Sequence, residues 1–297
     1  MKNSKVLYSL LIASLIVSST SLFGQKFEPK KRVTEPDITI TSEIMGKEYQ
    51  LYISFPGSYS TKDTTKYPVL YALDGRVGFP LFNYARETGE TAKELEEVII
   101  VGIGCGLDKA STDINRSYDF TPSRDTILDR SLAKRYSIST TTPLTGGAEK
   151  FLKCITTEII PYVDAHYKTT NDRGLMGHSF GGLFTAYCLL NSNGVFNRYG
   201  ISSPSFWWNN GEILNQAISF FSNNKTWDIP STKVYVAVGK NEGPRMVPDM
   251  VKFSMLLESR AYKNISLNWH IFEDETHSSV IPAALSRGLS ILYGKKK

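Results

Sequence analysis

The sequence predicts an α/β fold with a mostly parallel central sheet, an antiparallel hairpin at its N-terminal end and helices on both faces. Near-continuous apolar runs such as Tyr67–Leu73 are typical of strands that are buried on both faces of a parallel sheet. These runs alternate with segments of helical periodicity, which is the order that builds a parallel sheet covered by helices. Apolar and polar residues alternate between Ile38 and Phe55, on both sides of Met45-Gly46-Lys47, and this pattern predicts the hairpin.

Residues 1–24 are expected to be a secretory signal peptide rather than part of the fold. Lys2 and Lys5 precede an apolar run over residues 6–17, and small and polar residues follow the run. A membrane-spanning helix needs about 20 apolar residues, so this run is short for one. We expect cleavage after Gly24 and a mature protein that is secreted or periplasmic, with a retained N-terminal anchor as the alternative.

The rest of the chain is expected to form a linker over residues 25–36 and a single domain over residues 37–297. The formal net charge of the whole chain is +5 at pH 7, and the sequence has no long run of lysine and arginine. A charge this small and scattered does not predict a nucleic-acid-binding surface. After removal of the signal peptide, no second long apolar segment predicts an association with the membrane.

The three cysteines do not form a recognisable framework. Cys105, Cys154 and Cys188 are too few for a set of disulfides and lack the spacing of metal ligands. Cys154 and Cys188 lie in helical apolar patterns, so buried free thiols are expected, with one oxidised pair as the alternative. The sequence predicts neither a metal site nor a cofactor.

Beyond the first buried strand, strands and helices are expected to alternate to the end of the chain. The further strands are expected at Val98–Ile103, directly before Ser179, and at Arg198–Ile201, Lys233–Val238 and Ile265–Phe272. The helices are expected through Ala92 and Leu95, at Ala148–Ile160, from Phe180 onward, and at Ile213–Phe221, Val247–Ala261 and Ile281–Leu292. Residues 105–145 are polar and show no sustained periodicity, so they are expected to be an irregular insertion with a functional role.

The segment Gly177-His178-Ser179-Phe180-Gly181-Gly182 carries the strongest local signal for chemistry. It follows a short apolar strand, precedes a helical pattern, and contains the Gly-x-Ser-x-Gly spacing of a nucleophile elbow. In such an elbow a strained turn lifts the serine hydroxyl above the edge of a sheet, and the glycines are expected to leave room on either side. The sequence therefore predicts that Ser179 is a nucleophile; an ordinary strand–turn–helix connection is the alternative.

A serine nucleophile needs a base, and His277 is the candidate. On a fold of this kind the serine is followed along the chain by the acid and then the histidine. Among the four histidines, His166 precedes Ser179, His178 adjoins it, and His270 lies within a strand, where it is expected to be packed. His277 follows the last predicted strand by a short polar loop, from which an imidazole can reach the elbow.

The acid that orients the base is expected to be Glu242, in the loop after strand Lys233–Val238. A solvated surface glutamate is the alternative reading of this residue. Asp249, one turn into the next helix, and Asp274, three residues before His277, are further candidates.

An oxyanion hole needs two backbone N–H groups that point at the developing negative charge. The first is expected to come from Phe180, the residue after the nucleophile. The second is expected from Arg76 in the loop after Leu73, where Gly75 permits a turn toward the site.

Five segments carry a resemblance to a known family. The two most specific are Arg116-x-x-Asp119-Phe120-Thr121-Pro122 and Ser203-Pro204-Ser205-x-Trp207-Trp208. The other three are Leu73-Asp74-Gly75, the elbow and Glu275–Val280. The resemblance extends from about Asp37 to Tyr293. On these residues the chain resembles the putative-esterase branch of the α/β-hydrolases. That branch includes enterochelin (trilactone siderophore) esterases, esterase D-like S-formylglutathione hydrolases, feruloyl and acetyl-xylan esterases, and mycolyltransferases; the periplasmic siderophore esterases are the most similar.

The resemblance implies an α/β-hydrolase fold and ester hydrolysis through an acyl-enzyme, on a small-molecule substrate that is expected to be a siderophore trilactone. A catecholate or iron-bound siderophore is anionic and aromatic. Arg76, Arg116 and Arg245 are expected to offer charge to it, while Trp207 and Trp208 offer stacking surface. In the alternative reading both tryptophans fill the core below the elbow, and Arg116 pairs with Asp119 to hold the insertion.

Three further alternatives stay open. Some siderophore esterases are described as Ser–His dyads, which weakens the expectation for Glu242. The substrate could instead be a carbohydrate ester that carries acetyl or feruloyl groups, although no carbohydrate-binding module is present to favour it. In another class, the chain would be a binding module on a hydrolase fold without turnover, which the presence of both Ser179 and His277 argues against.

Overall fold

The computed structural model describes residues 35–139 and 141–295. The expected signal peptide, residues 1–24, and nearly all of the expected linker lie outside the described residues.

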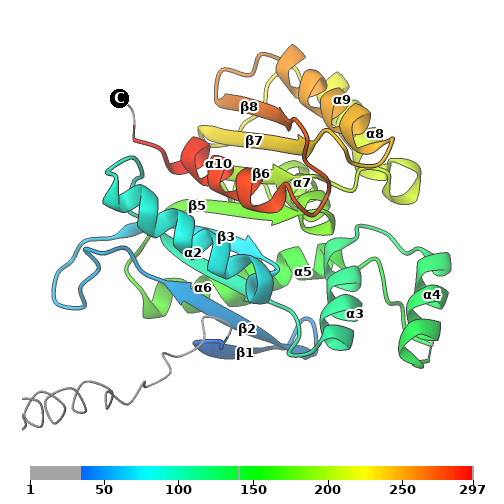
Figure 1. The fold of residues 1–297 in the computed structure, drawn as a ribbon, viewed down its shortest axis with the longest axis horizontal. Coiled ribbons are helices and arrows are strands. Elements are labelled where there is room, and N and C mark those ends of the chain that lie inside the picture. Colours follow the sequence, from blue (N-terminus) through cyan, green and yellow to red (C-terminus); the bar gives the residue numbers. More distant parts are fainter. Residues whose placement is uncertain (1–34, 140, 296–297) are drawn as a thin grey trace, which may run out of the picture. The chain divides into compact units, whose positions relative to one another are not determined.

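A single eight-stranded sheet forms the centre of the described fold (Figure 1), in the order β1-β2-β4-β3-β5-β6-β7-β8. Strand β1 pairs antiparallel with β2, β2 pairs antiparallel with β4, and every other neighbouring pair is parallel. The prediction of a mostly parallel sheet behind an antiparallel hairpin is therefore confirmed. The strands are β1 (Ile38–Ser42), β2 (Lys47–Ser54), β3 (Tyr67–Leu73), β4 (Ile99–Gly104), β5 (Thr169–His178), β6 (Arg198–Ser202), β7 (Thr232–Gly239) and β8 (Ile265–Phe272).

Helices cover both faces of the sheet, as predicted. The α-helices are α2 (Gly75–Thr91), α3 (Lys109–Phe120), α4 (Thr126–Tyr136), α5 (Ala148–Cys154), α6 (Ile160–His166), α7 (Phe180–Asn191), α8 (Glu212–Asn223), α9 (Met246–Ser259) and α10 (Ile281–Tyr293). Helices α2 and α10 pack on one face, and α5 and α7 to α9 pack on the other. A hydrophobic core lies on each face of the sheet, and strand β3 contributes to both because its side chains alternate. Val69 and Tyr71 belong to one core, and Leu70 and Ala72 belong to the other.

The expectation of an irregular segment over residues 105–145 is wrong, because this segment contains the helices α3 and α4. Neither helix has the long apolar face that periodicity would reveal. Both begin instead at a capping aspartate: Asp108 accepts a hydrogen bond from the Ser111 N–H, and Asp125 accepts from the N–H groups of Ile127 and Leu128. Phe120 then anchors the end of α3 by stacking on Phe184 of α7.

Three smaller expectations also change. The helix expected through Leu95 is α2, which begins directly after Asp74 and ends at Thr91. The single helix expected at Ala148–Ile160 continues to His166 and contains a π-helical turn, η1 (Ile155–Ile159). His270 is exposed rather than packed, because β8 is an edge strand of the sheet.

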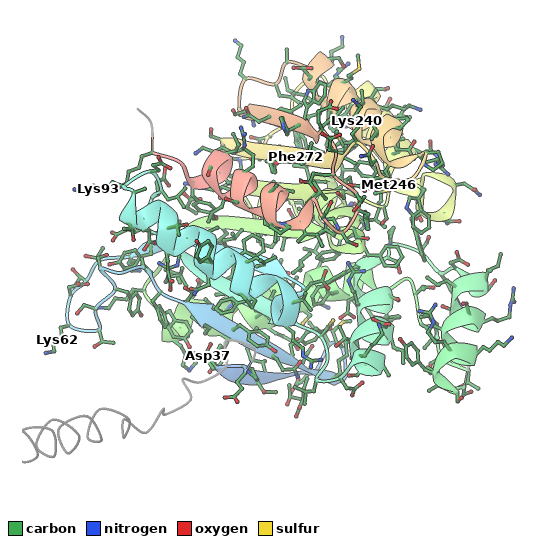
Figure 2. The ribbon with its side chains drawn as sticks, in the orientation of Figure 1. Asp37, Lys62, Lys93, Lys240, Met246 and Phe272 are labelled. Carbon is green, nitrogen blue, oxygen red and sulfur yellow. The ribbon has the colours of Figure 1, made fainter. Side chains whose placement is uncertain are left out.

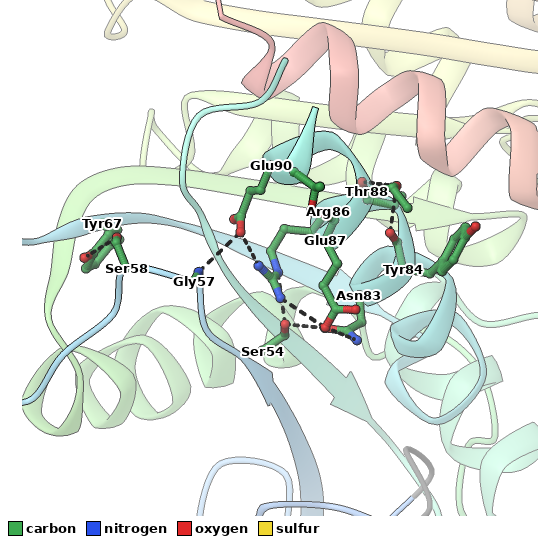
Figure 3. Close-up of polar contacts among 12 residues, drawn as sticks. Ser54, Gly57, Ser58, Tyr67, Asn83, Tyr84, Arg86, Glu87, Thr88 and Glu90 are labelled. Carbon is green, nitrogen blue, oxygen red and sulfur yellow. Dashed lines mark hydrogen bonds and ion pairs between the residues drawn. The ribbon is translucent and has the colours of Figure 1, made fainter. Parts of the chain in front are cut away.

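A polar cluster under α2 holds this helix to the end of β2 (Figure 3). Arg86 is buried, and it donates to Ser54 Oγ at 3.0 Å and to Glu90 Oε2 at 2.6 Å. The same Glu90 oxygen also accepts from the N–H of Gly57. Because a buried guanidinium is costly without partners, these contacts fix the position of α2. The first turn of α2 borders the candidate site described below.

None of the helices in the described residues has the length and the apolar composition that crossing a membrane requires. Cys105, Cys154 and Cys188 are buried and unpaired, as expected for free thiols.

Candidate active site

The carboxyl ends of five neighbouring strands bring the predicted site residues to one edge of the sheet. Ser179 follows β5, Glu242 follows β7 and His277 follows β8. The N–H of Lys240 donates to the carbonyl of Phe272 at 2.9 Å, so the loop that carries Glu242 is attached to the end of β8. Figure 2 labels Lys240, Phe272 and Met246 around this loop. Ligands of open α/β sheets bind at this edge.

Ser179 lies in a strained turn between β5 and α7, with φ 62° and ψ −117°. The glycines around Ser179 differ in how much room a side chain would have at each position. A Cβ at Gly177 would lie 2.5 Å from the backbone of Gly181, and a Cβ at Gly182 would lie 2.4 Å from the carbonyl oxygen of Ser202. At Gly181 a Cβ would find its nearest atom at 3.5 Å, an ordinary contact. The turn therefore needs glycine at positions 177 and 182, and position 181 has room for a Cβ, contrary to the expectation.

The three side chains form a chain of hydrogen bonds. Nε2 of His277 lies 2.9 Å from Oγ of Ser179, and Nδ1 of His277 lies 2.7 Å from Oε2 of Glu242. The His277 side chain is 43% exposed and that of Glu242 is completely buried. Asp249, an alternative acid, pairs instead with Arg245 at 3.2 Å. A carboxylate at Nδ1 leaves Nε2 as the acceptor for the serine proton, which is the arrangement of a nucleophile with its base.

Glu242 is held by donors other than the histidine. Ser203 Oγ and the Gly239 N–H both donate to Oε1 at 2.6 Å. Burial by itself would raise the pKa of Glu242, but the hydrogen bonds from His277, Ser203 and Gly239 outweigh it, so the pKa lies below its ordinary value. Glu242 is therefore a carboxylate at neutral pH.

The loop after β6 contributes contacts that sequence reasoning missed. Besides Ser203, which has a positive φ of 42°, Ser205 Oγ lies 3.4 Å from Ser179 Oγ and Ser202 Oγ lies 3.1 Å from His178 Nδ1. All three serines are buried. Their run in the sequence, directly after a buried strand, was a visible signal, but nothing local indicates which side chain each one meets.

His178 packs against the candidate base. The two imidazole rings are 4.6 Å apart, centroid to centroid. Burial, followed by the neighbouring His277, lowers the pKa of His178 to about 3. His178 is therefore uncharged over the working range of an enzyme, and it places no positive charge against an imidazolium that forms on His277.

The buried, neutral state of His178 makes stability depend on pH. The unfolded chain protonates this residue near pH 6.5 and the folded chain only near pH 3. Between these values the unfolded state binds more protons, so the free energy of unfolding should fall as the pH falls below about 6.5. Urea midpoints at pH 7.5 and pH 5.0 should therefore differ less in His178→Gln than in the unmodified protein. The exposed His166→Gln is the control and should keep the full difference; an unchanged difference in His178→Gln would contradict the assignment.

Arg116 pairs with Asp74, and not with Asp119 as in the alternative reading of this residue. Its Nε and Nη2 donate to the two carboxylate oxygens of Asp74 at 2.7 and 3.0 Å, and Nη2 also donates to the carbonyl of His178 at 3.0 Å. Asp119, the partner in that alternative reading, instead accepts from Lys47 and Tyr49 in a buried cluster. Burial raises the pKa of Asp119 to about 6 against the pull of Lys47.

The candidate oxyanion donors lie at helix starts. Phe180 is the first residue of α7 and Arg76 the second residue of α2, so both N–H groups belong to the first turn, where no intrahelical acceptor exists. Asp74, before α2, has a left-handed backbone with φ 56°. Gly75 lies against β4, where a Cβ would be 2.6 Å from the backbone of Gly102. The close approach of Gly75 to β4 thus sets where α2 begins.

Two cavities adjoin the elbow. The larger, of about 460 Å³, lies between α3, α4 and the loop after β6, and we call it the Trp207 cavity. Arg116, Phe180, Trp207 and Trp208 are among its lining residues. Trp207 is 41% exposed, whereas Trp208 is buried and packs edge-on against Phe180. Arg245, expected to contact substrate, is not among the described residues that line this cavity.

The second cavity, of about 260 Å³, lies between the first turns of α2 and α10 and the helix α3. We call it the α2–α10 cavity. Asp113 and Arg116 line both cavities and so form a shared wall. In the described part of the chain, no group of three or more His, Cys, Asp or Glu side chains is arranged to hold a metal ion.

Comparison with known proteins agrees with this geometry. The model of the family described as "Putative esterase" matches residues 42–264. The ferri-bacillibactin esterase BesA of Bacillus subtilis is 27% identical over 258 residues, which cover 84% of this chain and 86% of that protein. The siderophore enterobactin esterase of Emericella nidulans is 26% identical over 283 residues, which cover 84% and 92%.

A solved structure shows the same likeness in three dimensions. The crystal structure of the BES protein from Bacillus cereus is 31% identical and superposes with a TM-score of 0.71, covering 86% of this chain and 94% of that one. The family match covers most of the chain, and the relatives are named as esterases. The chain therefore belongs to the putative-esterase family and is a serine carboxylic-ester hydrolase.

Proposed function

We propose that this enzyme hydrolyses the ester bonds of a siderophore trilactone, with Ser179 as nucleophile, His277 as base and Glu242 as the residue that orients the base. The observation that carries the proposal is the Ser179–His277–Glu242 hydrogen-bond chain beside a cavity with aromatic and cationic walls. The activities in the names of the relatives support the choice of substrate.

In the first half of the reaction, Ser179 Oγ attacks the ester carbonyl while its proton passes to Nε2 of His277. The imidazolium that forms is stabilised by the Glu242 carboxylate 2.7 Å from Nδ1. The negative charge on the former carbonyl oxygen is met by the N–H groups of Phe180 and Arg76. Collapse of the tetrahedral intermediate breaks the ester bond, and His277 returns its proton to the leaving alkoxide.

In the second half, water replaces the alcohol and gives a proton to His277 as it attacks the acyl-enzyme. The second tetrahedral intermediate collapses, the carboxylic acid leaves, and Ser179 regains its proton from His277. The neutral His178 ring beside His277 favours both steps, because each requires His277 to carry a positive charge transiently.

The Trp207 cavity is proposed to hold the substrate. Phe180, Trp207 and Trp208 offer aromatic surface there, and Arg135 offers a cation. Arg245, in its pair with Asp249, is left out of the proposal.

We assign Arg116 a positioning role. It ties Asp74, which precedes the Arg76 donor, to the His178 carbonyl, which precedes Ser179, and so it holds the two halves of the oxyanion hole together. Arg116→Gln should therefore lower kcat by about 10²- to 10³-fold, the usual cost of a lost oxyanion donor, with a smaller change in KM. Arg116→Lys keeps the charge but not the paired geometry, so its kcat should lie between those of the unmodified enzyme and Arg116→Gln.

Steady-state kinetics on 4-nitrophenyl acetate check this expectation. Arg135→Gln is the matched control, since Arg135 lines the Trp207 cavity without contacting the elbow, and it should leave kcat for this uncharged ester unchanged. A rise in KM at constant kcat in Arg116→Gln would instead assign Arg116 to substrate binding.

The substrate is tested directly. The purified enzyme is incubated with a catecholate trilactone, with and without iron, and with a feruloylated oligosaccharide, and linear products are sought by mass spectrometry. Hydrolysis of the trilactone, absent in Ser179→Ala, is the expected result. Release of ferulate alone would overturn the siderophore proposal in favour of a carbohydrate ester.

We further propose that residues 1–24 direct export and are removed after Gly24. The mass of the protein recovered from the periplasm or medium of an expressing bacterium checks this. Recovery of the uncleaved chain in the membrane fraction would favour the retained anchor.

A further inference from the structure

The α2–α10 cavity has largely apolar walls and lies next to the reacting groups. Gly177 and His178, the two residues before Ser179, line it, and so does Asp74, two residues before the Arg76 donor. Its apolar walls come from the end of β3 and the N-terminal halves of α2 and α10, through Leu73, Val77, Phe82, Ile281 and Leu285. The cavity therefore borders the residues that precede Ser179 and the Arg76 donor, on the other side of Arg116 from the Trp207 cavity.

One polar atom on a residue that lines this cavity, Thr112 Oγ1, is buried and has no hydrogen-bond partner among the described residues. A buried polar group without a partner costs free energy, so each such atom calls for an explanation. A hydroxyl group on a guest is a suitable partner for the Thr112 hydroxyl, because each can both donate and accept a hydrogen bond.

The charges around the cavity are already paired. Both carboxylate oxygens of Asp74 accept from Arg116, and Asp113 accepts from Lys109 and Tyr136. An ionised guest would add an unpaired charge next to apolar walls, which is unfavourable. The cavity therefore suits an uncharged guest.

The size of the cavity favours an organic group over water. One water occupies about 30 Å³ of liquid volume, so a volume of about 260 Å³ would need several waters, and the apolar walls offer them few partners. A cavity of roughly 150 Å³ already accommodates benzene. A six-membered ring or short chain with one or two polar atoms fits the available space.

We propose that the α2–α10 cavity is a second substrate subsite, which takes one arm of the ester as an uncharged, hydroxyl-bearing ring or short chain of about the size of phenol. The proposal rests on the proposed site around Ser179 but not on the identity of the natural ester. The subsite would divide the substrate between two cavities, with Arg116 between them.

Phenol, toluene and benzoate are the probes, tested as inhibitors of 4-nitrophenyl acetate hydrolysis and, in a separate binding measurement, by thermal shift on Ser179→Ala. Phenol should raise the apparent KM without changing kcat. Toluene should bind about three- to tenfold more weakly because it lacks the hydroxyl, and benzoate should not compete. Phenol inhibition that lowers kcat at constant KM, or equal binding of benzoate, would overturn the proposal.

Two substitutions locate the binding, each with a matched control. Thr112→Val removes one unpartnered hydroxyl at constant shape and should weaken phenol about three- to tenfold while leaving toluene unchanged. Thr88→Val, exposed on α2, should change neither.

Val77→Trp, at a rim residue that is 70% exposed, should close the mouth of the cavity and abolish competition by both phenol and toluene. Tyr84→Trp, equally exposed on the same helix, should leave competition intact. Phenol binding that survives both Thr112→Val and Val77→Trp unchanged would place the binding elsewhere and defeat the proposal. If phenol competes but no trilactone is cleaved, the siderophore proposal fails while the subsite stands.

Discussion

Ser179→Ala should lower kcat/KM for 4-nitrophenyl acetate and butyrate by about 10⁶-fold, because without the hydroxyl no acyl-enzyme can form. The hydroxyl is held 2.9 Å from the His277 nitrogen by a turn with φ 62°, and no other serine has this combination among the described residues. The residual rate should come from substrate binding and the oxyanion donors alone. A fluorophosphonate probe should label the unmodified enzyme at Ser179 and leave the variant unlabelled.

Ser205→Ala is the matched control for this prediction. Ser205 Oγ lies 3.4 Å from Ser179 Oγ, so this variant removes a neighbouring hydroxyl but keeps the nucleophile and its base. It should retain most of the activity and the labelling. Labelling at a residue other than Ser179, or turnover that survives in Ser179→Ala, would show that the nucleophile is elsewhere.

His277→Ala should cost about as much as Ser179→Ala, whereas Glu242→Ala should cost about 10⁴-fold. The smaller cost for Glu242 follows from its proposed role, in which it orients the imidazole and stabilises the imidazolium without touching the reacting atoms. The double variant of Ser179 and His277 should be no worse than either single variant, since the two act as one unit. Single-turnover and steady-state kinetics on the same acetate ester measure these losses.

Asp249→Asn and Asp274→Asn test the alternative acids. Asp249 pairs with Arg245, and Glu242 is the carboxylate hydrogen-bonded to Nδ1, so both substitutions should leave kcat within about tenfold. A loss for Asp274→Asn larger than that for Glu242→Ala would reassign the acid. A Glu242→Ala enzyme with unchanged kcat would make the pair a Ser–His dyad.

Much of the fold could be predicted because many of its strands and helices have a recognisable pattern of apolar residues in the local sequence. The apolar runs that became β3, β4 and β7 and the helical faces of α9 and α10 carry their own periodicity. Residues 105–145 were misjudged because α3 and α4 depend on capping aspartates and on packing against other helices. The π-helical turn at Ile155–Ile159 has no local signal of this kind either.

Some features of the candidate site could likewise be predicted from the sequence, and others could not. Chain order and loop position were enough to select Ser179, Glu242 and His277, since a fold of this class fixes which loops meet. The alternative in which Arg116 pairs with Asp119 is wrong, because nearness along one helix does not decide which acid a guanidinium meets. The chain instead brings Asp74 to Arg116 across 42 residues.

The sequence by itself thus determined the class of fold, the elbow at Ser179 and the loops that carry the candidate nucleophile, acid and base, because these depend on short-range pattern and on topology. Only the tertiary structure decided the Arg116–Asp74 link, the support of Glu242 by Ser203, the neutral His178 beside His277, and the two cavities on either side of Arg116. These features depend on distances between side chains far apart in the sequence, and on burial, which no local pattern encodes.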